Sequence, residues 1–138
     1  MKTYSPDQVI VTFGAHVVTG FADGSFVKLA RNEDAYSLVV GIDGEGTRAK
    51  VNNKSGQCEL TLLQSSDSND YLTSVAITDE QNNGGLQPLT VKDLSGRTLA
   101  FAEQAYIKKI SDVEFAREVG NRVWVLETDS LVLNVAGN

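Results

Sequence analysis

Short runs in which apolar and polar residues alternate recur along almost the whole chain. They fall at residues 9–13, 26, 38–42, 58–62, 89–91, 99–101, 106–110, 123–126 and 131–135. A period of two is typical of a β-strand with one buried face. Glycine-containing pairs such as Asp23-Gly24, Asp43-Gly44 and Ser95-Gly96 separate several runs and favour tight turns. The pattern predicts a mainly β fold, an antiparallel β-sandwich or barrel, and argues against a doubly wound parallel sheet.

One segment departs from this period. Residues 67–70, Asp-Ser-Asn-Asp, offer capping oxygens and negative charge, and Leu72, Val75 and Ala76 then recur at helical spacing. Gly84 or Gly85 can adopt the left-handed conformation that ends a helix. We therefore expect one α-helix near residues 68–82, and a further helical turn around residues 112–118.

The length and composition set the scale of the fold. A chain of 138 residues fits a single domain, 1–138, and its hydrophobic content of 41% is ordinary for a globular protein. No apolar run approaches the roughly 18 residues of a membrane span. The polar N-terminal residues lack the apolar core of a secretory signal, so we expect no membrane span and synthesis in the cytoplasm without Sec export.

The formal charge of −6 bears on possible partners. Clamping nucleic-acid phosphates requires clustered lysine and arginine, so an acidic chain is a poor phosphate clamp. An acidic wall that faces a channel would instead let DNA slide past. The net charge therefore argues against a protein that clamps nucleic-acid phosphates, and it is compatible with an acidic channel through which DNA passes.

The sequence offers few routes to catalysis. His16 is the only histidine and lacks a nucleophile motif nearby, which favours a structural or an exposed histidine. Cys58 is the only cysteine; its alternating run predicts a core position, and it has no partner for an internal disulfide. We expect no enzyme activity, no catalytic residue, no metal and no cofactor, although a pair of carboxylates remains open as an acid–base alternative.

Two ligand-binding patterns fail on spacing. The acidic residues Asp43, Glu45, Asp67, Asp70, Asp79 and Glu80 do not have the spacing of a calcium loop, which favours turn formation and solubility. Gly41, Gly44 and Gly46 lack the Lys-Ser or Lys-Thr that completes a phosphate-binding loop, and they lead into a strand. Neither pattern predicts a ligand site.

Three stretches together resemble one protein family. They are residues 4–9 (Tyr-Ser-Pro-Asp-Gln-Val), the loop and strand 41–64, and residues 64–70 (Gln-Ser-Ser-Asp-Ser-Asn-Asp). The chain is similar over nearly its full length to the tail tube proteins of contractile-tailed bacteriophages, which are related in fold to pyocin and type VI secretion tube proteins. The string at 64–70 is the most specific part of the resemblance.

The resemblance implies a structural protein of the virion tail. It implies a small β-sandwich or split barrel with one helix, six copies of which close into a ring. Rings would stack into a hollow tube with an electronegative lumen that conducts genomic DNA without binding it specifically. The implied partners are further copies of the chain and the tail sheath, baseplate and tail terminator proteins.

The polar excursion at residues 43–55 gains a role from this resemblance. As an inter-ring or inter-subunit loop it would carry its contacts on Asp43, Glu45, Arg48, Lys50, Asn52, Asn53 and Lys54. The basic residues would pair with carboxylates of a neighbour, and the two asparagines would hydrogen-bond. Deleting residues 44–55 should leave a folded subunit and weaken ring stacking.

Two alternatives stay open from the sequence. The chain is also compatible with the tube of a headless injection or secretion machine, through which no genome passes. From another class, it is compatible with a monomeric β-sandwich that binds carbohydrate or peptide through exposed aromatic residues. Tyr36, Tyr106 and Trp124 are the plausible set, although Trp124 fits a core or subunit-interface position better.

Overall fold

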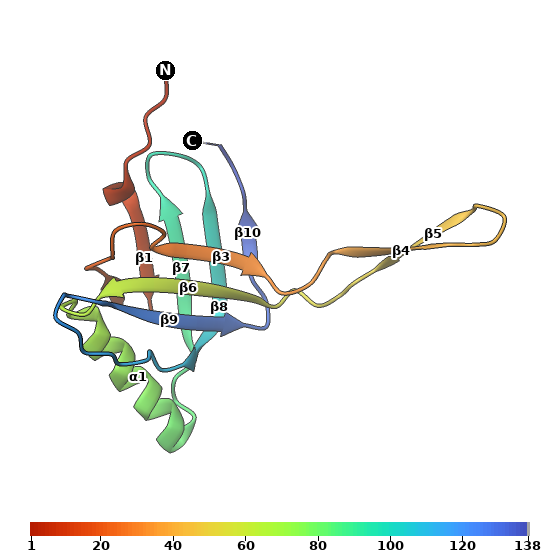
Figure 1. Ribbon diagram of the computed structural model, residues 1–138. Helices are drawn as coiled ribbons and strands as arrows, with labels where there is room; N and C mark the ends of the chain where they lie inside the picture. Colours follow the sequence, from red (N-terminus) through yellow and green to blue (C-terminus); the bar gives the residue numbers. More distant parts are fainter. Residues whose placement is uncertain (138) are drawn as a thin grey trace.

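The structure of the protein, a computed structural model, describes residues 1–137 (Figure 1). A single-turn 3-10 helix, η1 (Pro6–Gln8), precedes the first strand, and α1 (Ser68–Asn82) lies between β6 and β7. The strands are β1 (Val9–Phe13), β2 (His16–Val18), β3 (Val27–Arg31), β4 (Tyr36–Val40), β5 (Gly46–Lys50), β6 (Gly56–Leu63), β7 (Gln87–Asp93), β8 (Leu99–Lys109), β9 (Asn121–Thr128) and β10 (Val132–Asn134).

Eight strands form one antiparallel sheet that divides at β8. Its order is β2-β1-β7-β8-β9-β6-β3, and β10 also pairs with β8. The start of β8 pairs with β10 at Phe101–Val132, whereas its end pairs with β9 at Ala105–Thr128. Figure 1 shows β3, β6 and β9 crossing in front of β1, β7, β8 and β10. The predicted mainly β, antiparallel architecture with one helix is confirmed.

The core fills the space between these two groups of strands. β6 alternates as predicted, with Cys58, Leu60 and Leu62 almost fully buried and the residues between them more exposed. Trp124 and Leu126 of β9 join the same apolar cluster, together with Val11, Phe13, Leu89, Val91, Ala100 and Ala102 from the other group. In these strands the apolar residues of the alternating pattern are thus the buried ones.

The helix lies where the sequence predicts it, but its ends are built differently. Asp67 occupies the N-cap position without a side-chain cap; the hydroxyl oxygen of Ser66 accepts the Ser68 N–H at 3.2 Å instead. At the other end Asn83, not Gly84 or Gly85, adopts the left-handed conformation with φ 58°. Asparagine tolerates this region because its short polar side chain bonds locally.

Residues 112–118 are not helical, so that part of the prediction is wrong. The segment connects β8 to β9 and has no buried apolar face, since Val113 and Phe115 both point to solvent. A short helix is marginal in water unless it buries an apolar face, and residues 112–118 are all exposed. The exposed ion pair Lys109–Asp112 lies at the start of the segment.

Candidate functional site

A β-hairpin that projects from the sheet is the most distinctive surface feature. β4 and β5 pair only with each other, from Tyr36 opposite Lys50 to Val40 opposite Gly46. Figure 1 shows this ribbon extending well away from the strands of the larger sheet. A strand rises about 3.3 Å per residue, so each five-residue arm spans roughly 17 Å.

The tip of the hairpin is closed by its own backbone and one carboxylate. The Gly41 N–H donates to the Glu45 carbonyl at 2.8 Å, and the Gly44 N–H donates to the Gly41 carbonyl at 3.0 Å. Gly44 has φ +87°, a region that favours glycine. The carboxylate of Asp43 accepts the Glu45 N–H at 3.1 Å. The turn predicted at Asp43-Gly44 is confirmed.

The apolar residues of the hairpin are exposed, although the sequence alternation is typical of a half-buried strand. Leu38 is 68%, Val39 67%, Val40 58% and Ile42 110% exposed. Directly opposed residues share a face, so Tyr36, Leu38 and Val40 lie on the same side as Arg48 and Lys50. A lone two-stranded hairpin is marginally stable in water, which makes these uncovered side chains candidates for contact with another molecule.

This basic, apolar face has one internal contact. The guanidinium of Arg48 lies 4.2 Å from the centre of the Tyr36 ring, a cation–π arrangement that pre-orients the arginine. The ion pairs among residues 1–137 are Lys108–Glu127 and Lys109–Asp112, both outside the hairpin. Arg48 and Lys50 therefore present their charges to the surroundings.

The root of the hairpin is held firmly to the larger sheet. Asn32 and Ser55 bond through backbone at 3.0 Å and through side chains at 2.9 Å. The Leu131 N–H donates to the Lys54 carbonyl at 2.9 Å, and the Arg31 guanidinium donates to the Leu131 carbonyl at 2.8 Å. The hairpin is thus free along its length but fixed at its base.

A carboxylate beside the root gathers polar side chains. Glu127 accepts from the Tyr106 hydroxyl at 2.6 Å and from the Asn32 amide at 3.3 Å. The Tyr106 bond, followed by the Gln57 amide, lowers the pKa of Glu127, while the same bond raises the pKa of Tyr106. The network links β6, β8 and β9 to Asn32, the residue that follows β3, next to the hairpin.

The structure separates the predicted loop residues into three groups. Asp43 and Glu45 form the turn, and Arg48 and Lys50 lie on β5 beside exposed apolar residues. The other three, Asn52, Asn53 and Lys54, return toward the root, where Asn53 accepts the Ser55 N–H at 3.0 Å. The projecting segment therefore begins near residue 32, earlier than the predicted 43.

Sequence reasoning missed the ascending arm. The alternation of Leu38, Val40 and Ile42 predicts an ordinary strand, and together with Tyr36 and Val39 these residues prove to be the largest apolar part of the hairpin. A signal was available, because Val39 breaks the alternation and places an apolar residue on each face. Such a strand needs cover on both sides, which this chain does not supply.

The predicted structural residues occupy structural positions. Cys58 is 1% exposed, and burial, reinforced by the charge of Glu59, raises the pKa of its thiol to about 12. Nε2 of His16 lies 2.9 Å from the Ser68 hydroxyl, and its ring stacks on Tyr71 with centroids 4.4 Å apart. Both predictions, a core cysteine and a structural histidine, are confirmed.

The three aromatic residues considered for ligand binding do not form one surface. Trp124 is 2% exposed and belongs to the core. The hydroxyl of Tyr106 is engaged by Glu127, and Tyr36 lies on the hairpin under Arg48. The hypothesis that Tyr36, Tyr106 and Trp124 form one binding platform is therefore wrong, because the buried ring of Trp124 cannot stack on a ligand together with the other two.

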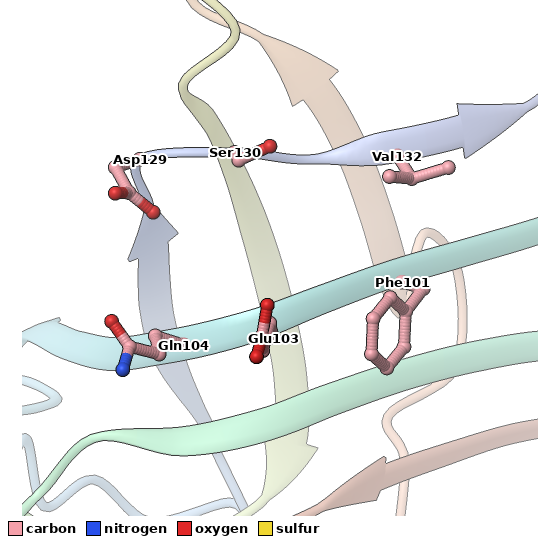
Figure 2. Close-up of a pocket in the computed structure, with 6 residues that line it drawn as sticks. All are labelled: Phe101, Glu103, Gln104, Asp129, Ser130 and Val132. Atoms are coloured by element: carbon pink, nitrogen blue, oxygen red, sulfur yellow. The ribbon is translucent and has the colours of Figure 1, made fainter.

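A second surface feature lies where the sheet divides at β8. A depression of about 310 Å³ is lined by Phe101, Glu103, Gln104, Asp129, Ser130 and Val132. Figure 2 shows the first three along β8, facing the segment that carries the other three. We call this depression the acidic notch, after the carboxylates of Glu103 and Asp129. Phe101 and Val132 pair across the strands and are 41% and 58% exposed.

Residues 1–137 contain no group of three or more histidine, cysteine or acidic side chains arranged to hold a metal ion. Within the same residues, no helix is long and apolar enough to cross a membrane.

Comparison with solved structures identifies the fold. The chain aligns with a chain of the sheath/tube terminator of an extracellular contractile injection system, PVC, in its extended state, with a TM-score of 0.63, 12% identity and coverage of 98% of this chain and 99% of that one. It also aligns with the tube-terminating cap of the anti-feeding prophage, with a TM-score of 0.61 and 10% identity. This alignment covers 99% of this chain and 93% of that one. A chain of the PVC sheath–tube complex in its extended state aligns with a TM-score of 0.59 and 12% identity. The alignment covers 97% of this chain and 93% of that one.

Comparison at the level of sequence identifies the family. No family model matches the chain. Structural protein ORF10 of Pseudomonas phage KPP10 is 32% identical over 145 aligned residues, which cover 99% of this chain and 84% of that protein. Identity at this level over almost the full chain reflects common descent, and the chain belongs to the family of phage structural proteins that includes ORF10 of phage KPP10.

Proposed function

We propose that the protein is a subunit of the tail tube of a contractile-tailed phage. Copies close into hexameric rings, and the rings stack into a hollow tube enclosed by a contractile sheath. One observation carries the proposal, namely a hairpin that projects from the sheet and leaves Leu38, Val39, Val40 and Ile42 exposed. Such a hairpin is stabilised when a neighbouring copy covers it.

The free edges of the sheet support the same conclusion. β2 and β3 end the strand order, and each presents unpaired backbone groups along one side. Exposed edges template pairing with another chain, and ring closure removes them. A contact between two different surfaces of identical copies repeats head to tail and generates a ring or a tube.

The charge suits a passive conduit. The net charge of −6 keeps DNA from adhering to a wall built of many copies, so genomic DNA passes through the lumen without specific binding. The sheath, the baseplate and the tail terminator are the expected partners, and the virion tail is the expected location. A headless injection or secretion machine would use the same tube without a genome.

The second candidate is a subunit that ends the tube. Two of the similar folds belong to structures described as a sheath/tube terminator and a tube-terminating cap. Copy number separates the two functions, because a tube contains many rings and a terminator one. Quantitative mass spectrometry of purified particles should find this chain in large excess over single-ring proteins; a ratio near one would favour the terminator.

Electron microscopy of the purified protein across a concentration series tests the proposal directly. Rings or hollow tubes are the expected result, with a baseplate preparation added as a nucleus where the free protein does not polymerise. Particles that remain single copies at high concentration and with a nucleus would overturn it. The control is a variant in which Asn-Gly replaces residues 36–50, which removes the exposed apolar side chains of the hairpin.

A further inference from the structure

The hairpin and the acidic notch are complementary in two independent ways. The hairpin face presents the cations Arg48 and Lys50 beside Tyr36, Leu38 and Val40. The notch presents the carboxylates of Glu103 and Asp129 beside Phe101 and Val132, and is lined by no basic residue (Figure 2). Each surface thus combines exposed apolar area with charge of one sign, and the signs are opposite.

The charges on both surfaces lack an ionic partner within residues 1–137, because the two ion pairs there involve other side chains. The notch volume of about 310 Å³ corresponds to roughly ten water molecules, enough to admit more than one side chain. Excluding water from around a charge pair strengthens the attraction between the two charges. A contact that covers the apolar side chains of both surfaces would exclude water in this way.

The hairpin cannot reach the notch of its own chain. The notch residue Ser130 bridges to Lys54 at the hairpin root, so the notch lies beside the base of the hairpin. The tip at residues 41–45 points away from the larger sheet (Figure 1). An occupant with this face must therefore come from a second copy.

We propose that the basic, apolar face of the hairpin, formed by Tyr36, Leu38, Val40, Arg48 and Lys50, docks into the acidic notch of a second copy, formed by Phe101, Glu103, Asp129 and Val132. Because the notch lies at the root of the recipient's own hairpin, each docked copy offers its hairpin to the next. The contact is heterologous and propagates. The inference rests on the proposed function, since it requires copies of the chain to assemble.

Charge reversal on either side tests the contact. Arg48→Glu places a carboxylate against Glu103 and Asp129, and Glu103→Arg places a cation against Arg48. Like charges at an interface are strongly unfavourable, so each variant should raise the protein concentration needed for assembly by about tenfold or more. Arg117→Glu, an equal charge change at an exposed residue between β8 and β9, is the matched control and should assemble more nearly like the wild type.

Mixing the two defective variants makes the test sharp. In an alternating assembly, the Arg48→Glu hairpin meets the Glu103→Arg notch, and the unchanged hairpin of the second variant meets the unchanged notch of the first. The equimolar mixture should therefore assemble at a lower concentration than either variant alone, and so should the double variant. Restored assembly also shows that both variants are folded.

The outcomes separate the two proposals. Single variants that assemble like the wild type, or a mixture as defective as its components, would overturn the docking contact while wild-type tubes still support the proposed function. Wild-type protein that forms no ring or tube, even on a baseplate, would overturn the proposed function and the docking contact together. The readout is sedimentation with electron microscopy of the pellet.

Discussion

The indole N–H of Trp124 donates to the side-chain oxygen of Asn69 at 3.0 Å, and this bond ties the first turn of α1 to the middle of β9. The amide of Asn69 also donates to the Leu63 carbonyl at 3.0 Å, where β6 ends. One polar side chain thus joins a helix and two strands. Trp124 is the only tryptophan, so its fluorescence reports this junction.

Replacing Asn69 tests the junction. Asn69→Ala leaves the buried indole N–H without a protein partner, and we expect the free energy of unfolding to fall by about 1–3 kcal/mol. Asn69→Asp keeps the acceptor for the indole but turns a carboxylate oxygen toward the carbonyl oxygens of Leu63 and Gln64, so it should also be destabilising. Urea unfolding followed by Trp124 fluorescence measures both, and equal stability of Asn69→Ala and wild type would contradict the role.

Gly56 at the root of the hairpin leaves no room for a side chain. A Cβ atom there would lie 2.5 Å from Cδ2 of Leu131 and 2.9 Å from the Ala30 carbonyl oxygen. We expect Gly56→Ala to destabilise the fold by about 1–3 kcal/mol through overpacking. Gly120→Ala is the control, because its nearest contact is an ordinary 3.6 Å to Gln64. Thermal unfolding that ranks the two variants equally would refute the steric argument.

Cys58 should make stability fall at alkaline pH. Its thiol pKa is raised to about 12 in the folded protein, against about 8.5 for a free thiol, so the unfolded chain ionises first. The stabilisation is complete below about pH 8.5 and is lost as the pH rises toward 12, by about 1.4 kcal/mol per pH unit. Between pH 8 and 10, wild type should lose more stability than Cys58→Ala, as urea unfolding would show; parallel curves would argue against it.

The hairpin should be removable without loss of the fold. The Val51 N–H already donates to the Ala35 carbonyl at 2.9 Å, the bond that a two-residue turn requires. Replacing residues 36–50 with Asn-Gly should therefore change the free energy of unfolding by about 1 kcal/mol or less and abolish assembly. Thermal unfolding and electron microscopy check the two halves of this prediction.

Removal of residues 44–55, which the sequence alone singled out, is a poorer experiment. It takes away Lys54 and Ser55, whose backbone carbonyls accept the N–H groups of Leu131 and Asn32. It also removes the partner strand of β4 and leaves the five exposed apolar side chains of residues 36–42 on an unpaired segment. Comparing the two deletions separates damage to the root from loss of the projecting arm.

The sequence predicts the fold well where local pattern and burial coincide. Cys58, Leu60 and Leu62 alternate and are buried, and the spacing of Leu72, Val75 and Ala76 locates α1 at Ser68–Asn82. It predicts the capping residues of α1 poorly. Ser66, not Asp67, bonds the first helical N–H, and Asn83, not Gly84 or Gly85, adopts the left-handed conformation. That choice depends on backbone geometry fixed by tertiary packing.

The interaction surfaces were only half predictable. The polar residues of the hairpin, such as Arg48 and Lys50, attract attention because a glycine-rich polar stretch looks like a loop. Leu38 and Val40 look like core residues, because period two does not say which molecule supplies the cover. The acidic notch could not be predicted from the sequence. Glu103 and Asp129 are far apart in the chain, and they line one depression only because the sheet divides at β8.

Because β4 and β5 pair only with each other among residues 1–137, the length of the hairpin is independent of the rest of the molecule. Inserting two residues in each arm would preserve which side chains share a face and move the tip outward by about 7 Å. The number of residues in the hairpin therefore sets the distance between its tip and the larger sheet. In an assembly joined through it, the spacing between neighbouring copies would change with the number of residue pairs in two strands, while the core stayed as it is.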